Sequence, residues 1–408
     1  MSNCKIINDP VHGFIEIPKG VILDLIDTDT YQRLRRIRQL ALSYLVYPGA
    51  IHSRFNHCIG AMHLTQQALS TLRGKGVGIS EKEYEGTLLA ILLHDIGHGP
   101  FSHALENVIL QGLHHERMSM SIMQYLNKRM GGVLDEAIRI FKGDHPKIFL
   151  HQLVSSQLDM DRMDYLVRDS YFTGVVEGLV SADRIIKTLD VRDNRLVVES
   201  KGIYSVENFL VARRLMYWQV YLHRAVLSAE HMMVHILERA RELMYDQVPI
   251  WSNDLLDFFF RQNALMHIDI NEETIEKYIR LDDEDILYAM KQWRDSDDPV
   301  LSRLCSNLLG RRLLKVKMQY EPFDEEVVAK ERSSVAKSLK VSFENAKHFI
   351  FTGEVSNLAY MLGNDEPITI LHKDGSKSDI TEASDIRSID ALSRPVVKYF
   401  LCYPGKNF

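Results

Sequence analysis

The segment Leu92-Leu93-His94-Asp95-Ile96-Gly97-His98-Gly99-Pro100-Phe101-Ser102-His103 joins an apolar helix to side chains of metal-binding type. The apolar run from Leu88 to Leu93 predicts a buried helix, and its end presents a histidine and an aspartate side by side. Gly97 and Gly99 then interrupt the helix. Neutral imidazole and carboxylate are good ligands for borderline divalent metals such as Fe, Mn, Ni or Zn. The segment therefore predicts a metal site at the end of a buried helix.

Two neighbouring ligands do not complete a metal site, so further ligands must come from other parts of the chain. Candidates are the histidine of Ser53-Arg54-Phe55-Asn56-His57 and the central aspartate of Asp159-Met160-Asp161-Arg162-Met163. On a helix, Asp161 and Tyr165 share one face, and Asp169 extends that face by another turn. A lone His-Asp pair is usually a surface feature, but these partners favour a metal site. The predicted metal ligands are His57, His94, Asp95 and Asp161.

The overall composition is that of an ordinary globular protein. The chain has 408 residues, of which 46% are hydrophobic and 25% charged, with a net charge of -6. A net negative charge argues against broad nucleic-acid binding. Four scattered cysteines, the lack of an apolar leader at the start and the lack of a long apolar run favour a cytoplasmic protein without a membrane span.

Apolar periodicity predicts a mainly helical body over residues 1–320. Ser80 and Glu83 form a capping box that predicts a helix start at this point. The other predicted helices are Tyr31 to Leu45, His57 to Leu72, Leu153 to Val167 and Val206 to Arg241.

Strand patterns are local and lie mostly near the end of the chain. Asp193-Asn194 predicts a hairpin turn between Val191 and Leu196 to Val198, and Asp374-Gly375 predicts another turn. Further predicted strands are Leu314 to Tyr320, Ile368 to Leu371 and Val396 to Cys402. We therefore expect a mainly α protein with a smaller mixed α/β region at residues 321–408.

Motifs along residues 1–240 carry a family resemblance. They are Lys5 to Gly13, Gln32 to Arg35, Gln39-Leu40, Pro48 to Ala50, Ser53 to Phe55, His57, His94 to His103, Asp161 to Asp169, Tyr217, Tyr221 and His223. In these motifs the chain resembles the HD superfamily, named for its adjacent His-Asp ligands. It is most similar to the branch of bacterial HD-domain dNTP triphosphohydrolases and the animal SAM-and-HD-domain enzyme. The resemblance implies an HD-domain helical bundle.

The resemblance also implies an activity, which is hydrolysis of a dNTP to deoxynucleoside and tripolyphosphate. A divalent metal ion, with Mg a further candidate, would activate the water that attacks the α-phosphorus. His103 matches the general acid of the family, and Glu106 stands where the animal enzyme has an orienting aspartate. His98 and His115 match further active-site histidines.

Substrate contacts also follow from the resemblance. Arg54, Arg162 and Arg213 match phosphate contacts, with Arg162 in place of a lysine. Gln39, Leu40, Asp169 and Tyr221 match residues that line the deoxyribose, where a tyrosine against C2′ leaves no room for a 2′-hydroxyl. The predicted substrate-binding residues are Gln39, Leu40, Arg54, Arg162, Tyr165, Asp169, Arg213, Tyr217 and Tyr221.

A second set of residues matches the activator site of the family, which implies regulation by GTP or dGTP. Asp27 has the chemistry to accept from the N1 and N2 edge of guanine, Gln32 and Arg35 to donate, and Phe55 to stack. Such a site would lie between subunits, so we expect a homodimer or homotetramer. The predicted activator residues are Lys5, Ile6, Asn8, Asp27, Gln32, Arg35 and Phe55.

Two alternatives stay open. The HD scaffold also supports phosphomonoesterases and cyclic-nucleotide phosphodiesterases, and the arginines around the site favour the triphosphohydrolase over both. A non-catalytic module that senses nucleotides or binds nucleic acid is the other alternative. Its best support is the run of basic residues Arg33, Arg35, Arg36 and Arg38.

Overall fold

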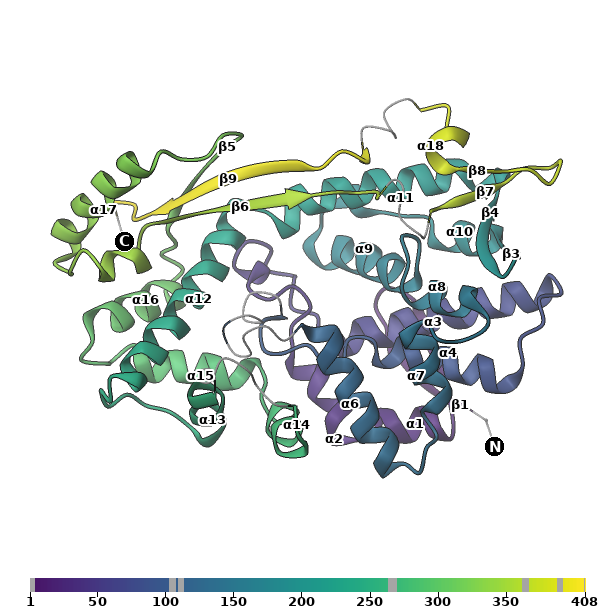
Figure 1. The fold of residues 1–408 in the computed structure, drawn as a ribbon, viewed down its shortest axis with the longest axis horizontal. Helices are drawn as coiled ribbons and strands as arrows, with labels where there is room; N and C mark the ends of the chain where they lie inside the picture. Colours follow the sequence, from purple (N-terminus) through teal and green to yellow (C-terminus); the bar gives the residue numbers. More distant parts are fainter. Residues whose placement is uncertain are drawn as a thin grey trace.

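A computed structural model describes residues 4–102, 108, 114–262, 270–361, 367–386, 392–406 and 408. These residues form a mainly helical body with small sheets at its edges, which confirms the predicted fold class (Figure 1). Among them, no helix is both long enough and apolar enough to cross a membrane.

Helix α4 (Glu81–Leu93) lies at the centre of the N-terminal body and is buried at every position from Gly86 to Leu93. Its start confirms the predicted capping box, because Ser80 Oγ accepts from Glu83 N at 3.2 Å and Ser80 N donates to Glu83 Oε2 at 2.8 Å. Helix α3 (Arg54–Gly74) packs against α4 and α9 (Met160–Thr173). Around these three lie α1 (Val21–Ile26), α2 (Asp29–Gln32), α6 (His115–Arg129), α7 (Asp135–Lys142), α8 (Ile148–Val154) and α10 (Ala182–Thr188).

The predicted helix from Tyr31 to Leu45 is wrong. Helix α2 passes into a short 3-10 turn that ends at Arg36, and Arg38 forms an isolated β-bridge with Ser53. Tertiary partners override the helical periodicity, because Arg38 N donates to Asp283 Oδ2 at 2.9 Å and buried Arg33 donates to the Leu281 carbonyl at 2.7 Å.

Of the three other predicted helices, His57 to Leu72 is confirmed within α3, and the remaining two are each interrupted. Helix α8 ends at Val154, and α9 begins at Met160 after Asp159, whose side chain accepts from Arg162 N at 2.7 Å. Helix α11 (Ile203–Met216) continues as a π-helical turn, Tyr217–Tyr221, before α12 (Arg224–Tyr245) begins. In both cases the apolar pattern continues across the break, so periodicity alone does not reveal it.

The remaining helices form the other half of the body, on the left of Figure 1 around α12. In this half, α12 packs against α16. The helices are α13 (Asp254–Gln262), α14 (Glu272–Tyr278), α15 (Asp283–Trp293), α16 (Pro299–Leu309) and α17 (Glu325–Leu339).

Two sheets join the end of the chain to the helical body. In one sheet, β3 (Leu189–Arg192) and β4 (Arg195–Glu199) form the predicted hairpin, and β7 (Thr369–Leu371) and β8 (Lys377–Asp379) extend it. In the other, β9 (Val396–Tyr403) lies between β5 (Lys315–Gln319) and β6 (Phe351–Asn357). Strands β6 and β9 run along the top of Figure 1, from α17 toward α11, and short helix α18 (Ile380–Ala383) follows β8.

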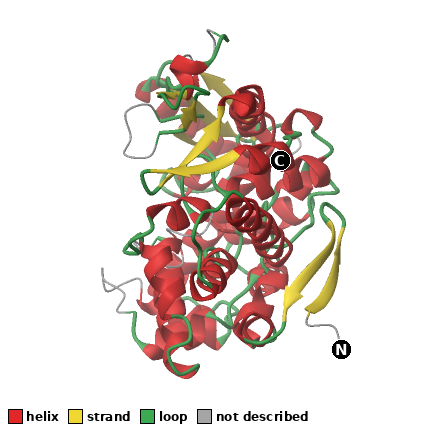
Figure 2. Cartoon of the chain, turned by 90° about the vertical axis from the view of Figure 1, so that its right-hand side faces the viewer, coloured by secondary structure: helices red, strands yellow, loops and turns green. Residues whose placement is uncertain are grey.

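The hairpin of β1 (Cys4–Asp9) and β2 (Gly13–Pro18) was not predicted from the sequence. It lies at the edge of the molecule, beside the N-terminus (Figure 2). The other predicted strands are confirmed as β5, β7 and β9, whereas β6 and β8 were also missed.

Candidate metal centre and adjoining cavity

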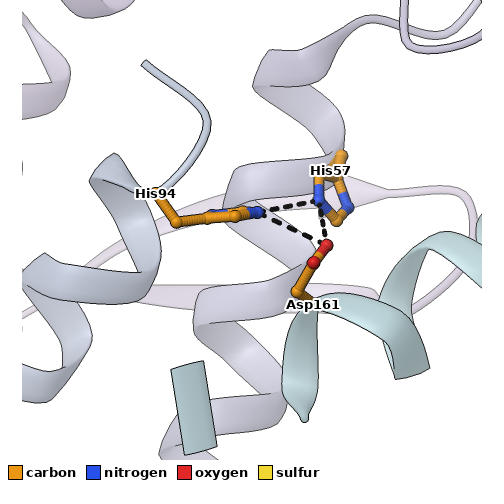
Figure 3. A group of neighbouring side chains, drawn as sticks. All are labelled: His57, His94 and Asp161. Atoms are coloured by element: carbon orange, nitrogen blue, oxygen red, sulfur yellow. Dashed lines mark hydrogen bonds and ion pairs between the residues drawn. The ribbon is translucent and has the colours of Figure 1, made fainter. Parts of the chain in front are cut away.

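Three predicted ligands from three helices meet at one point (Figure 3). His57 lies on α3, His94 directly follows α4, and Asp161 lies in the first turn of α9. His57 Nε2 lies 3.0 Å from Asp161 Oδ1 and 3.3 Å from His94 Nε2, and His94 Nε2 lies 3.4 Å from Asp161 Oδ1. The Nε2 atoms of both rings therefore converge on one carboxylate oxygen.

The other nitrogen of each ring is already bonded, which fixes both ring orientations. His57 Nδ1 donates to Asp164 Oδ2 at 2.8 Å, and His94 Nδ1 donates to the Ile91 carbonyl at 2.6 Å. Histidine ligands of metals are held in this way by an outer carboxylate or carbonyl. Two imidazoles and a carboxylate whose Nε2 and Oδ1 atoms face one another fit a divalent metal ion.

Asp164 is the centre of a buried network behind the cluster. It accepts from His12 Nε2 at 2.6 Å and from Arg168 Nε at 2.8 Å, while Arg168 Nη1 donates to Asp9 Oδ2 at 2.8 Å. Gly60 leaves room for it, because a Cβ there would lie 2.0 Å from Asp164 Oδ1 and 2.2 Å from Arg168 Nη2. The network connects the β1–β2 hairpin to the ligand-bearing helices.

Asp95 approaches the cluster from the side. Its Oδ1 lies 3.4 Å from His94 Nε2 and its Oδ2 lies 3.8 Å from His57 Nε2. It also forms a close ion pair with Arg54, whose Nη2 donates to Ser102 Oγ at 2.7 Å. The carboxylate of Asp95 therefore lies between the histidines of the cluster and the guanidinium of Arg54.

Mutual electrostatics keep the acidic members of the cluster ionised. Burial raises the pKa of Asp161, but His94 and His57 outweigh it and hold the pKa well below the usual range. Burial alone would lower the pKa of His57, but its hydrogen bonds with Asp161 and Asp164 outweigh burial and raise the pKa to about 10. The cluster thus combines ionised carboxylates with imidazoles whose protonated form these carboxylates stabilise.

A cavity of about 410 Å³ opens beside the cluster. Asp95 and Asp161 belong to its wall, so ligand atoms border the space. The predicted residues that also line it are Gln39, Leu40, Arg54, His98, His115, Arg162, Tyr165, Asp169, Tyr217 and Tyr221. His98 and His115 are stacked with ring centroids 4.0 Å apart. The interruptions after α2 and α11 lie at this cavity, because Gln39 and Leu40 follow the first and Tyr217 and Tyr221 belong to the second.

One wall of the cavity is polar and rigid. Tyr221 donates to Asp169 Oδ2 at 2.8 Å, and buried His52 donates to Asp169 Oδ1 at 2.7 Å. Gln39 Oε1 is buried without a hydrogen-bond partner among the described residues. An unpaired buried acceptor is costly, so this wall is suited to a ligand that donates a hydrogen bond.

The predicted arginines are not equivalent. Arg162 lines the cavity while its Nε donates to the Ser156 carbonyl at 2.6 Å. Arg213 lies outside the lining and its Nη1 donates to the Ala359 carbonyl at 2.8 Å. Two arginines, Arg54 and Arg162, therefore face the cavity among the described residues.

Residues of the predicted activator site lie close together at the surface. Lys5 and Asp27 form an exposed ion pair at 3.7 Å, Gln32 donates to the Ile26 carbonyl, and Arg35 donates to Gln32 Oε1 at 2.7 Å. Ile6 and Asn8 are exposed on β1.

Phe55 differs from the expectation. It is buried, and the Arg35 guanidinium lies 3.6 Å from the centre of its ring. A guanine base does not reach this ring in the present arrangement, because Arg35 occupies the stacking position.

Two predicted catalytic residues, His103 and Glu106, lie outside the described residues. Sequence reasoning missed Asp164, His12 and His52, whose partners are distant in the chain. It also missed Glu230, a carboxyl on the cavity wall. Burial raises the pKa of Glu230 to about 8. A single glutamate in an amphipathic helix gives no sequence signal of this kind.

Comparisons with known proteins agree with this geometry. The HD domain family matches residues 54–169, which contain all four predicted metal ligands, and the HD associated region matches residues 180–258. A crystal structure described as a phosphohydrolase, from Bacteroides thetaiotaomicron, is 48% identical with a TM-score of 0.94 and covers 98% of this chain and 100% of its own.

Two relatives match by sequence, and only one of them is named for an activity. The uncharacterized protein YwfO of Bacillus subtilis is 33% identical over 95% of this chain and 89% of its own length. A Dictyostelium discoideum protein named as a homologue of the deoxynucleoside triphosphate triphosphohydrolase SAMHD1 is 34% identical over 59% of this chain. The match covers 50% of that protein, so this chain aligns with about half of it.

Proposed function

The chain belongs to the HD-domain family of phosphohydrolases, and from this premise we propose that it hydrolyses dNTPs to deoxynucleoside and tripolyphosphate. One observation carries the proposal. The cavity brings two of the predicted metal ligands, Asp95 and Asp161, into the same space as the Tyr221–Asp169 pair and the unpaired Oε1 of Gln39. Metal ligands on one side and a small polar wall on the other suit a phosphate and a sugar.

The polar wall supports a deoxyribose rather than a ribose. The 3′-hydroxyl of a deoxynucleotide would donate to Gln39 Oε1 or to Asp169, whose carboxylate is held by His52 and Tyr221. A tyrosine ring fixed by its hydroxyl would leave no room for a 2′-hydroxyl. The Dictyostelium relative is named for a dNTP activity, which supports the same substrate class.

The phosphates would bind at the opposite side of the cavity. A divalent ion held by His57, His94, Asp95 and Asp161 would supply charge neutralisation and a lowered pKa for water. Arg54 and Arg162 would orient the phosphate oxygens, and His115 and His98 would line their path. His103 would protonate the leaving 5′-oxygen, with Glu106 as its orienting carboxylate.

The products of the reaction test the proposal. Purified protein is incubated with each dNTP and a divalent metal, and the phosphorus products are separated. We expect tripolyphosphate and intact deoxynucleoside in equal amounts. Pyrophosphate with dNMP, or stepwise release of phosphate, would contradict the proposal and identify another HD chemistry.

The second candidate is a phosphomonoesterase or phosphodiesterase that uses the same metal ligands. Its support is the small number of cavity cations, since Arg213 lies outside the lining and Arg54 is paired with Asp95. A non-catalytic nucleic-acid module has weaker support. Arg33 of the basic run is buried, and Arg36 and Arg38 are paired with acidic residues at the start of α15.

We further propose that a guanine nucleotide regulates the enzyme as a homodimer or homotetramer. The predicted activator residues lie near an exposed face of the β1–β2 hairpin, where Ile6 is 59% and Phe14 74% exposed. Exposed apolar side chains of this kind are typical of subunit contacts. The guanine would bind Asp27 and Arg35 at the surface rather than stack on Phe55.

A further inference from the structure

A second group of metal-binding side chains lies far along the chain from the first. His235 and Glu238 are on α12, and His348 ends the short 3-10 helix Asn345–His348 that precedes β6. One ligand atom from each of the three lies within 4.8 Å of the others. The ligands of a tetrahedral Zn²⁺ site lie roughly 3.3 Å apart, given bonds of about 2.0–2.1 Å. Coordination of Zn²⁺ would therefore draw these three ligand atoms closer together.

His348 carries the strongest evidence. The residue is fully buried, and its Nδ1 has no hydrogen-bond partner among the described residues. Its Nε2 lies 3.2 Å from Glu242 Oε2. A buried imidazole with one nitrogen held by a carboxylate and the other unpaired is the arrangement seen in metal-ligating histidines. Without a ligand, the unpaired buried nitrogen costs free energy.

His235 and Glu238 supply the complementary donors. They are separated by one turn of α12, and His235 Nδ1 lies 2.8 Å from Glu238 Oε2. Both are partly exposed, so a cation has access to the group. The nearby cations Arg239 and Lys347 are each paired with Glu242, at 3.1 and 2.6 Å, which reduces their repulsion of a metal ion.

We propose that His235, Glu238 and His348 form a second, structural metal site for a borderline divalent cation, with Zn²⁺ the best match to two imidazoles and a carboxylate. Water would complete the coordination. The site would fasten the segment before β6 to α12. Because its ligands are distant in sequence, metal binding would stabilise the folded chain.

Zinc stoichiometry tests this site without use of activity. The starting protein, or parent, is the full chain with His94→Ala, a substitution that weakens the first cluster. All metal is removed from it, and its metal-free form is compared with the form to which Zn²⁺ has been added back. The parent should bind about one zinc per chain tightly, with a higher Tm than the metal-free form. Addition of either His235→Ala or Glu238→Gln should abolish both the bound zinc and the shift in Tm.

His372→Gln in the same parent is the matched control, because His372 bonds to Ser378 away from both clusters and should leave zinc binding unchanged. Co²⁺ added to the parent gives a second readout, since tetrahedral sites with imidazole ligands have a visible absorption band that His235→Ala should remove. Equal zinc content in the His235→Ala variant and the control overturns the proposal. A parent that binds no zinc also overturns it and leaves His235 and Glu238 as an ordinary helical ion pair.

Discussion

At the scale of single residues, the first cluster depends on which nitrogen each histidine presents. His57 and His94 direct their Nε2 atoms inward because Asp164 and the Ile91 carbonyl bind the other nitrogens. The sequence identifies the ligand types, whereas their usable atoms are set by partners on other elements. Loss of one ligand should therefore remove metal without loss of the surrounding core.

We predict that His94→Ala and Asp95→Ala each remove the metal bound at the first cluster, leave any metal at His235, Glu238 and His348 in place, and abolish hydrolysis, because each removes a donor from the first cluster. Metal analysis and far-UV circular dichroism of the purified variants check this. His63→Ala is the control, since His63 lies on α3 with His57 but bonds to Gln67 outside the cluster. Full metal and activity in both variants would reject the assigned ligands.

Glu230 leads to a prediction about pH. Burial raises its pKa from 4.5 to about 8, so the folded state holds this proton more tightly than the unfolded state. As the pH rises from 4.5 to about 8, the unfolded chain releases the proton first, and this residue lowers the free energy of unfolding progressively. Glu230→Gln should therefore gain stability relative to wild type across that range, with a constant difference above it.

Chemical unfolding of wild type and Glu230→Gln at several pH values measures this difference. Glu325→Gln, at an exposed position on α17, is the control and should show no such trend. A difference between Glu230→Gln and wild type that stays constant from pH 4.5 to 8 would show that the pKa of Glu230 is the same in the folded and unfolded states.

At the scale of elements, the close approach of α3 and α9 positions both the cluster and the network behind it. Gly60 is the contact point on α3, and Asp164 and Arg168 occupy the facing positions on α9. These two side chains are also bonded to His12, His57 and Asp9, so they have little freedom to move.

We predict that Gly60→Ala lowers the free energy of unfolding by about 1–3 kcal/mol or more, the usual range for overpacking. It should also reduce metal content, because displacement of Asp164 releases the ring of His57. Gly74→Ala is the matched control, since it lies at the end of the same helix with nothing within 4 Å of an added Cβ. Equal effects of the two substitutions would contradict a close-packed interface at Gly60.

At the scale of the whole molecule, the proposed regulation links the N-terminal hairpin to the metal centre. The hairpin carries Asp9 at the end of β1 and His12 in its turn, and both residues belong to the Asp164 network. A nucleotide bound beside Lys5 and Asp27 would therefore contact the same hairpin whose Asp9 and His12 are linked through the buried network to His57. Coupling requires tighter binding to the active assembly than to the inactive one.

We predict that GTP or dGTP increases hydrolysis of another dNTP and raises the mass of the protein in solution. Asp27→Ala should remove both effects at little cost in stability, because its ion pair with Lys5 is exposed. Light scattering and product assays with and without nucleotide measure the two effects. If GTP or dGTP changes neither the mass in solution nor the rate of hydrolysis, and Asp27→Ala behaves as wild type, the enzyme is constitutive and the proposed regulation is wrong.

Several features followed from the sequence alone because their causes are local. The buried helix before His94 is an uninterrupted apolar run, the start of α4 is a capping box, and the β3–β4 turn has Asp193 and Asn194 at positive φ. These residues specify their conformation through near neighbours. The residue types of the His-Asp pair and its candidate partners predicted the members of the cluster, and the family motifs implied the same residues.

Tertiary structure decided where the helices stop and which side chains meet. Arg38 is held in an extended segment by Asp283, and the chain turns at Leu222 and His223 before α12, although both regions have helical periodicity. These interruptions form the cavity wall. The bonds of Asp164 to His12 and His57, and the proximity of His348 to α12, join distant parts of the chain. Pairings of this kind depend on the packing of whole helices, which no local pattern of residues encodes.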